Sequence, residues 1–144
     1  MERVKKKERK RIHIARNDIM RLKEMIGIVR EVSEGHEPVL RKLERKLDRV
    51  QPCRAEDISD RVVTMNTVFR GAFLNTGRES VFWLGFPYAI DHDGKKLSVL
   101  TPMGVALLGS RLGTVIKWKT RTGYGRLIVK DIIYQPEASK DYHL

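Results

Sequence analysis

The sequence predicts an α+β protein: an N-terminal antiparallel helical hairpin, then a small antiparallel sheet with one helix packed on it. Three observations predict this class. Apolar residues recur every three to four positions through residues 12–53, which is typical of amphipathic helices. From Arg61 onward the apolar period changes to two, which is typical of strands. Residues 97–113 interrupt that pattern with one short helix.

The first eleven residues form a strongly basic arm with seven Lys and Arg, two Glu and almost nothing apolar. We expect this arm, residues 1–11, to be disordered, because such a segment has too little apolar surface to pack. It is either a solvated tail or an electrostatic arm that attracts polyanions such as nucleic acid. Its candidate nucleic-acid contacts are Lys5, Lys6, Lys7, Arg9, Lys10 and Arg11.

Residues 12–53 predict a short coiled-coil hairpin. A very short strand at residues 12–14 is followed by a helix that Asn17 or Asp18 caps, and Pro38 opens a second helix after a four-residue turn. Each helix has about 14 residues, so the hairpin reaches roughly 20 Å at 1.5 Å per residue. Residues 51–53 end it. The apolar stripes are Ile19, Leu22, Met25, Ile26 and Val29, then Leu40, Leu43, Leu47 and Val50.

Residues 54–144 predict the second domain, a sheet with tight turns at Asn75-Thr76-Gly77 and at Asp91-His92-Asp93-Gly94. Within this domain Thr101 is placed to cap a helix, with Pro102 at the first helical position. Val105, Leu108 and Leu112 form the buried stripe of that helix, and Gly109 and Gly113 end it. The expected strands are residues 62–65, 67–73, 80–88, 96–100, 114–119 and 125–134, with an irregular tail from residue 135.

Composition limits the function. The net charge is +11, and residues 1–53 supply +7 of it, which favours an acidic partner such as nucleic acid or an acidic protein surface. No apolar run is long enough for a membrane span, and there is no secretory h-region, so we expect no membrane association. A single cysteine, Cys53, suits a reducing cytoplasm. We expect a cytoplasmic monomer.

Signals of catalysis, metal binding and cofactor binding are missing from the sequence. It has no P-loop, dinucleotide fingerprint or zinc spacing, and its four histidines are scattered. Asp91-His92-Asp93 is interpreted as a loop-shaping turn rather than a catalytic fragment. We therefore expect a binding or regulatory protein rather than an enzyme, with no catalytic residue, no metal and no cofactor.

The string SVLTPMGVALLG at residues 98–109, followed by Gly113, resembles the core motif of the C-terminal domain of the bacterial Gre transcript-cleavage factors. Three further stretches resemble a short-hairpin branch of that family: LERKLDRVQ (43–51), VVTMN (62–66) and YQPEA (134–138) with Asp141 and Tyr142. The resemblance covers residues 12–144. It implies an FKBP-like sheet domain, a coiled-coil hairpin and binding to RNA polymerase near its secondary channel.

The resemblance also implies functional positions. In Gre factors the turn before the helix contacts the polymerase rim, which carries over to Leu100, Thr101 and Pro102, although Leu100 stands where the family can have an acidic residue. Acidic residues at the Gre hairpin tip help to hold a catalytic magnesium ion. Here the tip acids are Glu31, Glu34 and Glu37, and because the hairpin is short we expect no transcript cleavage.

Other interpretations remain open at the level of sequence. Thr101 and Pro102 are also ordinary helix-start residues, and the tip glutamates are also ordinary solvated residues beside a turn. The alternative function is direct binding of nucleic acid by the arm and hairpin, which can coexist with polymerase binding. A peptidyl-prolyl isomerase activity is suggested by fold analogy alone, which does not carry function.

Overall fold

The computed structural model describes residues 11–142. The predicted disorder of the basic arm therefore falls outside the described residues, except at Arg11. Five of the six candidate contacts in the arm lie outside them as well: Lys5, Lys6, Lys7, Arg9 and Lys10.

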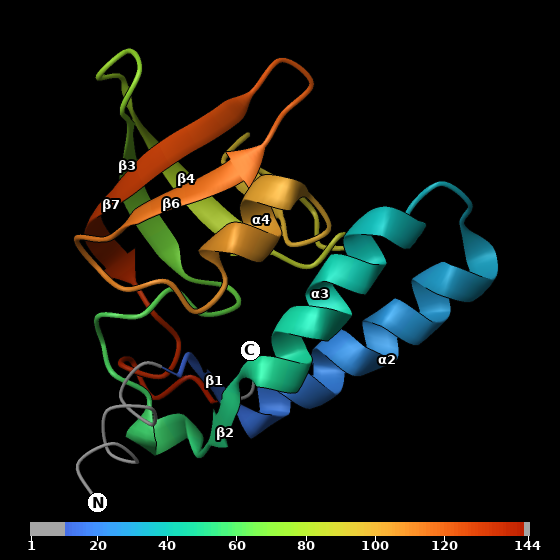
Figure 1. The fold of residues 1–144 in the computed structure, drawn as a ribbon. Coiled ribbons are helices and arrows are strands. Elements are labelled where there is room, and N and C mark those ends of the chain that lie inside the picture. Colours follow the sequence, from blue (N-terminus) through green and yellow to red (C-terminus); the bar gives the residue numbers. More distant parts are fainter. Residues whose placement is uncertain (1–10, 143–144) are drawn as a thin grey trace, which may run out of the picture.

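The N-terminal part is a helix pair, α2 (Arg16–Val32) and α3 (Glu37–Arg49), which lie side by side in opposite directions (Figure 1). Pro38 occupies the first turn of α3, where its missing N–H leaves no bond unmade. The predicted apolar stripes face each other and the rest of the protein. Their buried members are Leu22, Met25, Ile26, Leu40, Leu43, Leu47 and Val50.

Two short strands flank the helix pair at its base. β1 (His13–Ala15) precedes α2 and β2 (Gln51–Cys53) follows α3, and they pair in parallel with His13 opposite Gln51. The prediction that Asn17 or Asp18 caps α2 was wrong. The helix begins at Arg16 after Ala15, and no side chain caps it. Ala15, the residue before the helix, is the last residue of β1 and pairs with Cys53 of β2. The strand pair therefore fixes the position at which the helix starts.

The second part is a curled sheet with the strand order β5-β4-β3-β7-β6 (Figure 1). The prediction of an antiparallel sheet holds for three of its four strand pairs, but β4 and β5 are parallel, so the sheet is mixed. Residues 86–95 between them carry the chain back far enough for β5 to pair with Trp83–Gly85, the last three residues of β4. The strands are β3 (Val68–Phe73), β4 (Glu79–Gly85), β5 (Lys96–Ser98), β6 (Val115–Lys119) and β7 (Tyr124–Tyr134).

Residues 62–65, predicted as a strand, are a buried connection instead. Apart from an isolated bridge between Val62 and Arg111, this segment has no strand partner among residues 11–142. Its backbone is satisfied by a loop, because Val63 N donates to Ser110 O (2.8 Å) and Gly109 N donates to Val63 O (2.8 Å). An apolar run of this length is compatible with a strand or with an irregular buried connection. Here the hydrogen bonds to the neighbouring loop favour the connection.

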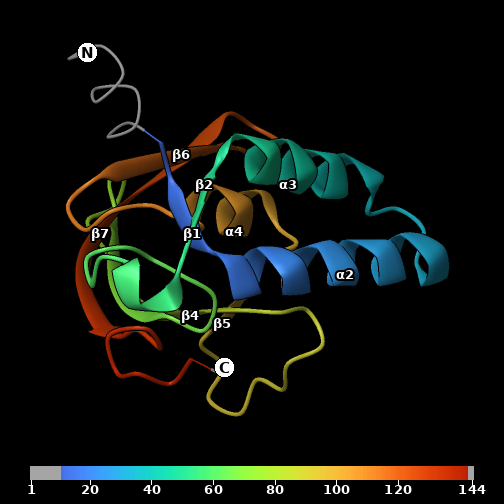
Figure 2. The same ribbon diagram turned by 90° about the horizontal axis from the view of Figure 1, so that it is seen from below.

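Helix α4 (Pro102–Leu107) lies between the sheet and α3 (Figure 2). It is shorter than predicted: Leu108 is its C-cap, Gly109 turns the chain with a φ of +80°, and Leu112 follows the helix. A Cβ on Gly109 would lie 2.1 Å from Ile12 Cγ2, so this close approach needs glycine. The early stop brings the loop after α4 against the connection at residues 62–65.

One hydrophobic core joins the two parts of the chain. It contains Leu22 and Leu43 from the helix pair together with Phe69, Leu84 and Leu127 from the sheet. A polar contact adds to it: Lys46 Nζ on α3 donates to Val105 O (2.5 Å) and Ala106 O (3.2 Å), near the C-terminus of α4. A cation is favourable at that end of a helix. Within residues 11–142 no helix is long and apolar enough to cross a membrane.

Candidate functional site

The turn that enters α4 is held by three short-range hydrogen bonds. Thr101 Oγ1 accepts from Gly104 N (3.0 Å) and donates to Ser98 O (2.8 Å), so the predicted cap is confirmed. Ser98 Oγ accepts from Leu100 N (3.1 Å). Because the Thr101 hydroxyl already donates and accepts within the turn, its main contribution is to fix the shape of the turn.

The three predicted contact residues therefore differ in how accessible their side chains are to a partner. Pro102 is exposed at the first turn of α4, Thr101 is half-buried in its hydrogen bonds, and Leu100 is half-buried against the core. Pro102 is the side chain of this turn that is most available to a partner. Leu100 is partly used by the fold itself, which limits the apolar area it can offer.

An ion-pair network occupies one side of the hairpin near its tip. Arg30 on α2 donates to both carboxylate oxygens of Glu37, at 3.0 and 3.1 Å, and to both oxygens of Glu44, at 2.6 and 3.2 Å. Arg41 reaches Glu37 at 3.3 Å. The Arg30 hydrogen bonds hold the pKa of the Glu37 carboxyl below its usual range. Glu37 is thus committed to two arginines rather than free.

The other two tip acids are placed differently. Glu31, near the end of α2, and Glu34, in the turn, are both exposed. In the part of the chain from residue 11 to 142, no group of three or more His, Cys, Asp or Glu side chains is arranged to hold a metal ion. Of the three predicted tip acids, the structure engages one with arginine and leaves two at the surface.

Asp91 shapes a turn, as the sequence predicted. Its Oδ1 accepts hydrogen bonds from Lys95 N (3.1 Å) and Lys96 N (3.2 Å), which closes the loop before β5. His92 and Asp93 are exposed in that loop. This geometry accounts for the Asp-His-Asp sequence without catalytic chemistry.

A buried polar cluster at the base of the hairpin was missed by sequence reasoning. Thr64 Oγ1 donates to Glu137 Oε1 (2.6 Å) and lies 2.9 Å from Thr67 Oγ1, while Met65 N donates to Asp18 Oδ2 (3.3 Å). The tail from residue 135, expected to be irregular, is thereby built into the core. The two stretches at residues 62–66 and 134–138 that carried the family resemblance meet here, which gives them a structural role.

Asp18 is the most perturbed carboxyl of this cluster. Its burial, together with the nearby negative charge of Glu137, raises its pKa to about 7. The hydrogen bond from Met65 N and, to a smaller extent, the positive charge of Arg21 lower the pKa. A carboxyl that takes up a proton near neutral pH is therefore buried where the helix pair, the connection at residues 62–65 and the C-terminal tail meet.

Fold and site together define a class of protein: a Gre-like fold in which a helix pair precedes a curled sheet with one short helix. The solved structure of the prokaryotic transcription elongation factor GreA/GreB from Nitrosomonas europaea is similar, with a TM-score of 0.69 and 31% identity. The match covers 86% of this chain and 98% of that one. The predicted fold class is confirmed.

The chain belongs to the family described as transcription elongation factor, GreA/GreB, C-term, which matches residues 58–134. It is also 39% identical over 108 residues to the regulator of nucleoside diphosphate kinase of Escherichia coli K12 and to that of Shigella flexneri. Those matches cover 74% of this chain and 79% of each relative. The predicted family resemblance is confirmed.

Proposed function

We propose that this protein is a regulator of transcription that binds RNA polymerase at the rim of the secondary channel and does not stimulate transcript cleavage. Membership of the GreA/GreB family supports the polymerase as partner. The observation that carries the proposed lack of cleavage is the state of Glu37 at the hairpin tip, held by Arg30 and Arg41. On this proposal the protein acts in the cytoplasm as a monomer and needs no cofactor.

The entrance of α4 supports the docking part of the proposal. The hydrogen bonds of Thr101 make the turn a preformed shape, and Pro102 stands exposed on it. A preformed surface loses little conformational entropy when a partner binds. We assign the contact mainly to Pro102, with Thr101 positioning it and Leu100 adding a small apolar area.

The hairpin supports the part of the proposal that excludes cleavage. α2 has 17 residues and α3 has 13, so the pair extends no more than about 25 Å at 1.5 Å per residue. Magnesium binds through free carboxylates, often one or two, with water completing its octahedron. Glu37 would have to give up its arginine partners before it could serve. Glu31, near the end of α2, and Glu34, in the turn, are the other two acids predicted at the tip.

The docking surface can be tested with Pro102→Asp. An aspartate at the first turn of a helix is favoured by the helix dipole, so the variant should stay folded while its contact surface changes in shape and charge. We expect its affinity for core RNA polymerase to fall about tenfold, equivalent to about 1.4 kcal/mol. Fluorescence anisotropy of the labelled full chain measures this.

Ser139→Asp is the matched control, because it adds the same charge at an exposed residue of the C-terminal turn. Its affinity should equal that of the unaltered protein. If Pro102→Asp is folded by circular dichroism and binds polymerase as tightly as the control, the docking surface is assigned wrongly.

The absence of cleavage can be tested in a backtracked elongation complex, with a transcript-cleaving Gre factor as the positive control. We expect the full chain, in excess over polymerase and with magnesium present, to leave the cleavage rate at its intrinsic value. The physical reason is that the tip is short and Glu37 is paired. A robust increase in cleavage that Glu31→Gln with Glu34→Gln abolishes would contradict the proposal and identify those two acids as functional.

Direct binding of nucleic acid is the alternative function. Among the described residues of the arm, Arg11 is exposed and its Nη1 donates to Gln51 Oε1 (3.3 Å), so it lies beside the base of the hairpin. This alternative predicts that the protein binds free RNA or DNA at concentrations where polymerase binding is weak. It also predicts that this affinity falls steeply as the salt concentration rises.

A further inference from the structure

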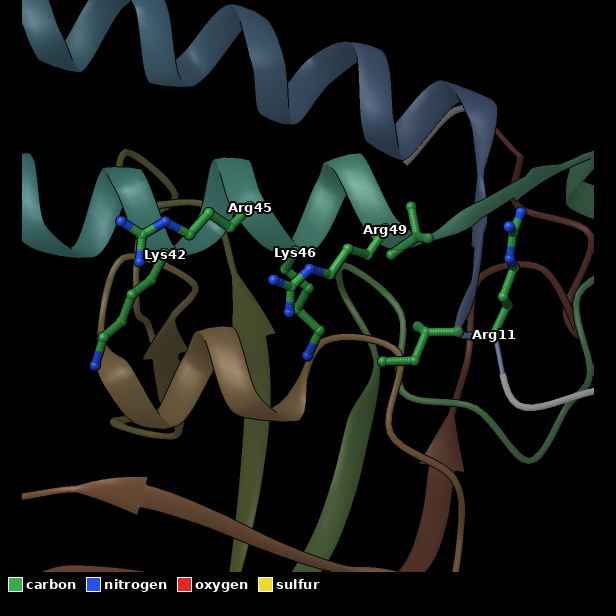
Figure 3. A pocket seen from close by; sticks show the side chains of 7 residues that line it. Arg11, Lys42, Arg45, Lys46 and Arg49 are labelled. Carbon is green, nitrogen blue, oxygen red and sulfur yellow. The ribbon is translucent and has the colours of Figure 1, made fainter. Parts of the chain in front are cut away.

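A basic pocket lies beside α3, on the side of that helix where Lys46 reaches α4 (Figure 3). Its volume is about 450 Å³, within the range of small-ligand sites. Five of its seven lining residues are cationic, and within residues 11–142 no acidic side chain lines it. The lining residues are Arg11, Ile12, Lys42, Arg45, Lys46, Arg49 and Val50.

Helix α3 separates its charges between two faces. Lys42, Arg45, Lys46 and Arg49 follow one another at spacings of three, one and three, which puts them on one face of the helix. The acids Glu44 and Asp48 lie on another face, where they line a groove beside α2, and Glu44 is paired with Arg30. The pocket's positive charges therefore have no acidic neighbour on their own side of α3.

At Lys46 the positive charge of the pocket extends below the protein surface. Its ammonium is bonded to the carbonyls of Val105 and Ala106, and no salt bridge is formed by it among the described residues. Burial lowers the pKa of Lys46 to about 8. An anion placed among these cations would be attracted by each of them.

We propose that this pocket binds a compact anion with two or more adjacent phosphate groups, such as a nucleoside di- or triphosphate. Arg45 and Arg49 supply the planar forks that bind phosphate oxygens in pairs, and Lys42 supplies a mobile point charge. Ile12 and Val50 form an apolar part of the wall. The proposal does not rest on the proposed function, because no residue of the α4 entrance lines this pocket, although Pro102 lines an adjoining groove with Lys42 and Lys46.

The same chemistry could come from the backbone of a single-stranded nucleic acid, but none of the seven residues that line the pocket is aromatic, which favours a compact ligand. Single strands bind through bases stacked on open rings. Lys117 Nζ already lies 3.9 Å from the centre of the Tyr124 ring. The Trp118 ring packs so closely on Gly125 that a Cβ there would lie 2.3 Å from it. Tyr124 and Trp118 line an adjoining groove rather than this pocket, so a strand stacked on them would have to extend beyond the pocket.

The test is calorimetric titration of the full chain with inorganic tripolyphosphate at near-physiological salt. We compare the unaltered protein with Arg45→Gln/Arg49→Gln and with a control, Lys95→Gln/Lys130→Gln, which removes two exposed cations outside the pocket. All four positions are exposed, so both variants should fold. We expect the pocket variant to bind about tenfold more weakly or worse, equivalent to at least about 1.4 kcal/mol, and the control to bind normally.

A second readout is the titration of the Lys46 side chain by NMR. Bound tripolyphosphate should raise the pKa of Lys46 above its value of about 8 in the free protein. Equal weakening in both double variants, an unmoved Lys46 titration or no binding at millimolar tripolyphosphate would overturn the proposal. Tight binding of a single-stranded oligonucleotide that tripolyphosphate and ATP do not displace would overturn the compact ligand in favour of a nucleic-acid backbone.

Discussion

Replacing Gly104 by alanine is expected to destabilise the protein by about 3 kcal/mol, the upper end of what overpacking usually costs. A Cβ at this position would lie 2.2 Å from Ser98 O and 2.9 Å from Val99 Cα. Both are backbone atoms, so no side chain can rotate away. The clash falls inside the turn that Thr101 closes, because Gly104 N donates to the Thr101 hydroxyl. Urea unfolding followed by circular dichroism measures the free energy of unfolding.

Gly27→Ala is the matched control, since it makes the same chemical change in the middle of a helix. Gly27 lies on α2, is exposed, and has nothing within 4 Å of an added Cβ. Alanine should therefore raise the free energy of unfolding, by about 0.5–1 kcal/mol. Equal effects of the two substitutions would show that the close approach at the α4 entrance is not what requires glycine.

Asp18→Asn is expected to flatten the pH dependence of stability. The parent's free energy of unfolding should fall between about pH 4 and pH 8, and a large part of that fall should be absent in the variant. The folded carboxyl has a pKa of about 7, whereas the unfolded one has its ordinary value near 3.8. Between these values the folded state keeps a proton that the unfolded state releases, so stability falls as pH rises and the fall ends above pH 7. The asparagine stays neutral throughout and can still accept from Met65 N. Relative to their difference near pH 4, the variant should gain on the order of 4 kcal/mol over the parent above pH 7.

The measurement is the free energy of unfolding across that pH range, read as the difference between each variant and the parent. Asp48→Asn is the control, because Asp48 is exposed on α3 and its replacement should shift the curve little. A curve for Asp18→Asn that runs parallel to the parent from pH 4 to 8 would mean that Asp18 ionises in the fold without penalty. The experiment thus tests whether burial of Asp18 beside Glu137 raises the pKa of Asp18.

Much of the architecture was predictable from local pattern. The stripes through Leu22, Ile26, Leu40 and Leu47 placed both helices, since a helix shows its buried face directly in residue spacing. Thr101 with Pro102 placed the start of α4 correctly. The hairpin of β6 and β7 was also predicted, because its strands are close in sequence and joined by a short turn.

Long-range contacts decided the features that were predicted wrongly or missed. β5 runs parallel to β4, and residues 62–65 form hydrogen bonds with a loop rather than with a strand. The spacing of apolar residues predicts neither the direction of a strand nor its partner. The start of α2 was misplaced for a similar reason: Asp18 resembled a cap, but it accepts from Met65 N, 47 positions away. The basic pocket could have been noticed, because the spacing of Lys42, Arg45, Lys46 and Arg49 puts four cations on one helical face.

Local sequence was enough to infer the α+β class, the helix pair, the capped turn before α4 and membership of the GreA/GreB family, because each depends on neighbouring residues or on a continuous motif. Three other features follow only from long-range contacts. The fold pairs Glu37 with Arg30, joins Asp18 to Met65 N and Thr64 to Glu137 of the tail, and sets Lys46 against the carbonyls of α4. Charges and polar groups act over a few ångströms of space, so their partners, and hence the chemistry open to them, follow from the fold rather than from order along the chain.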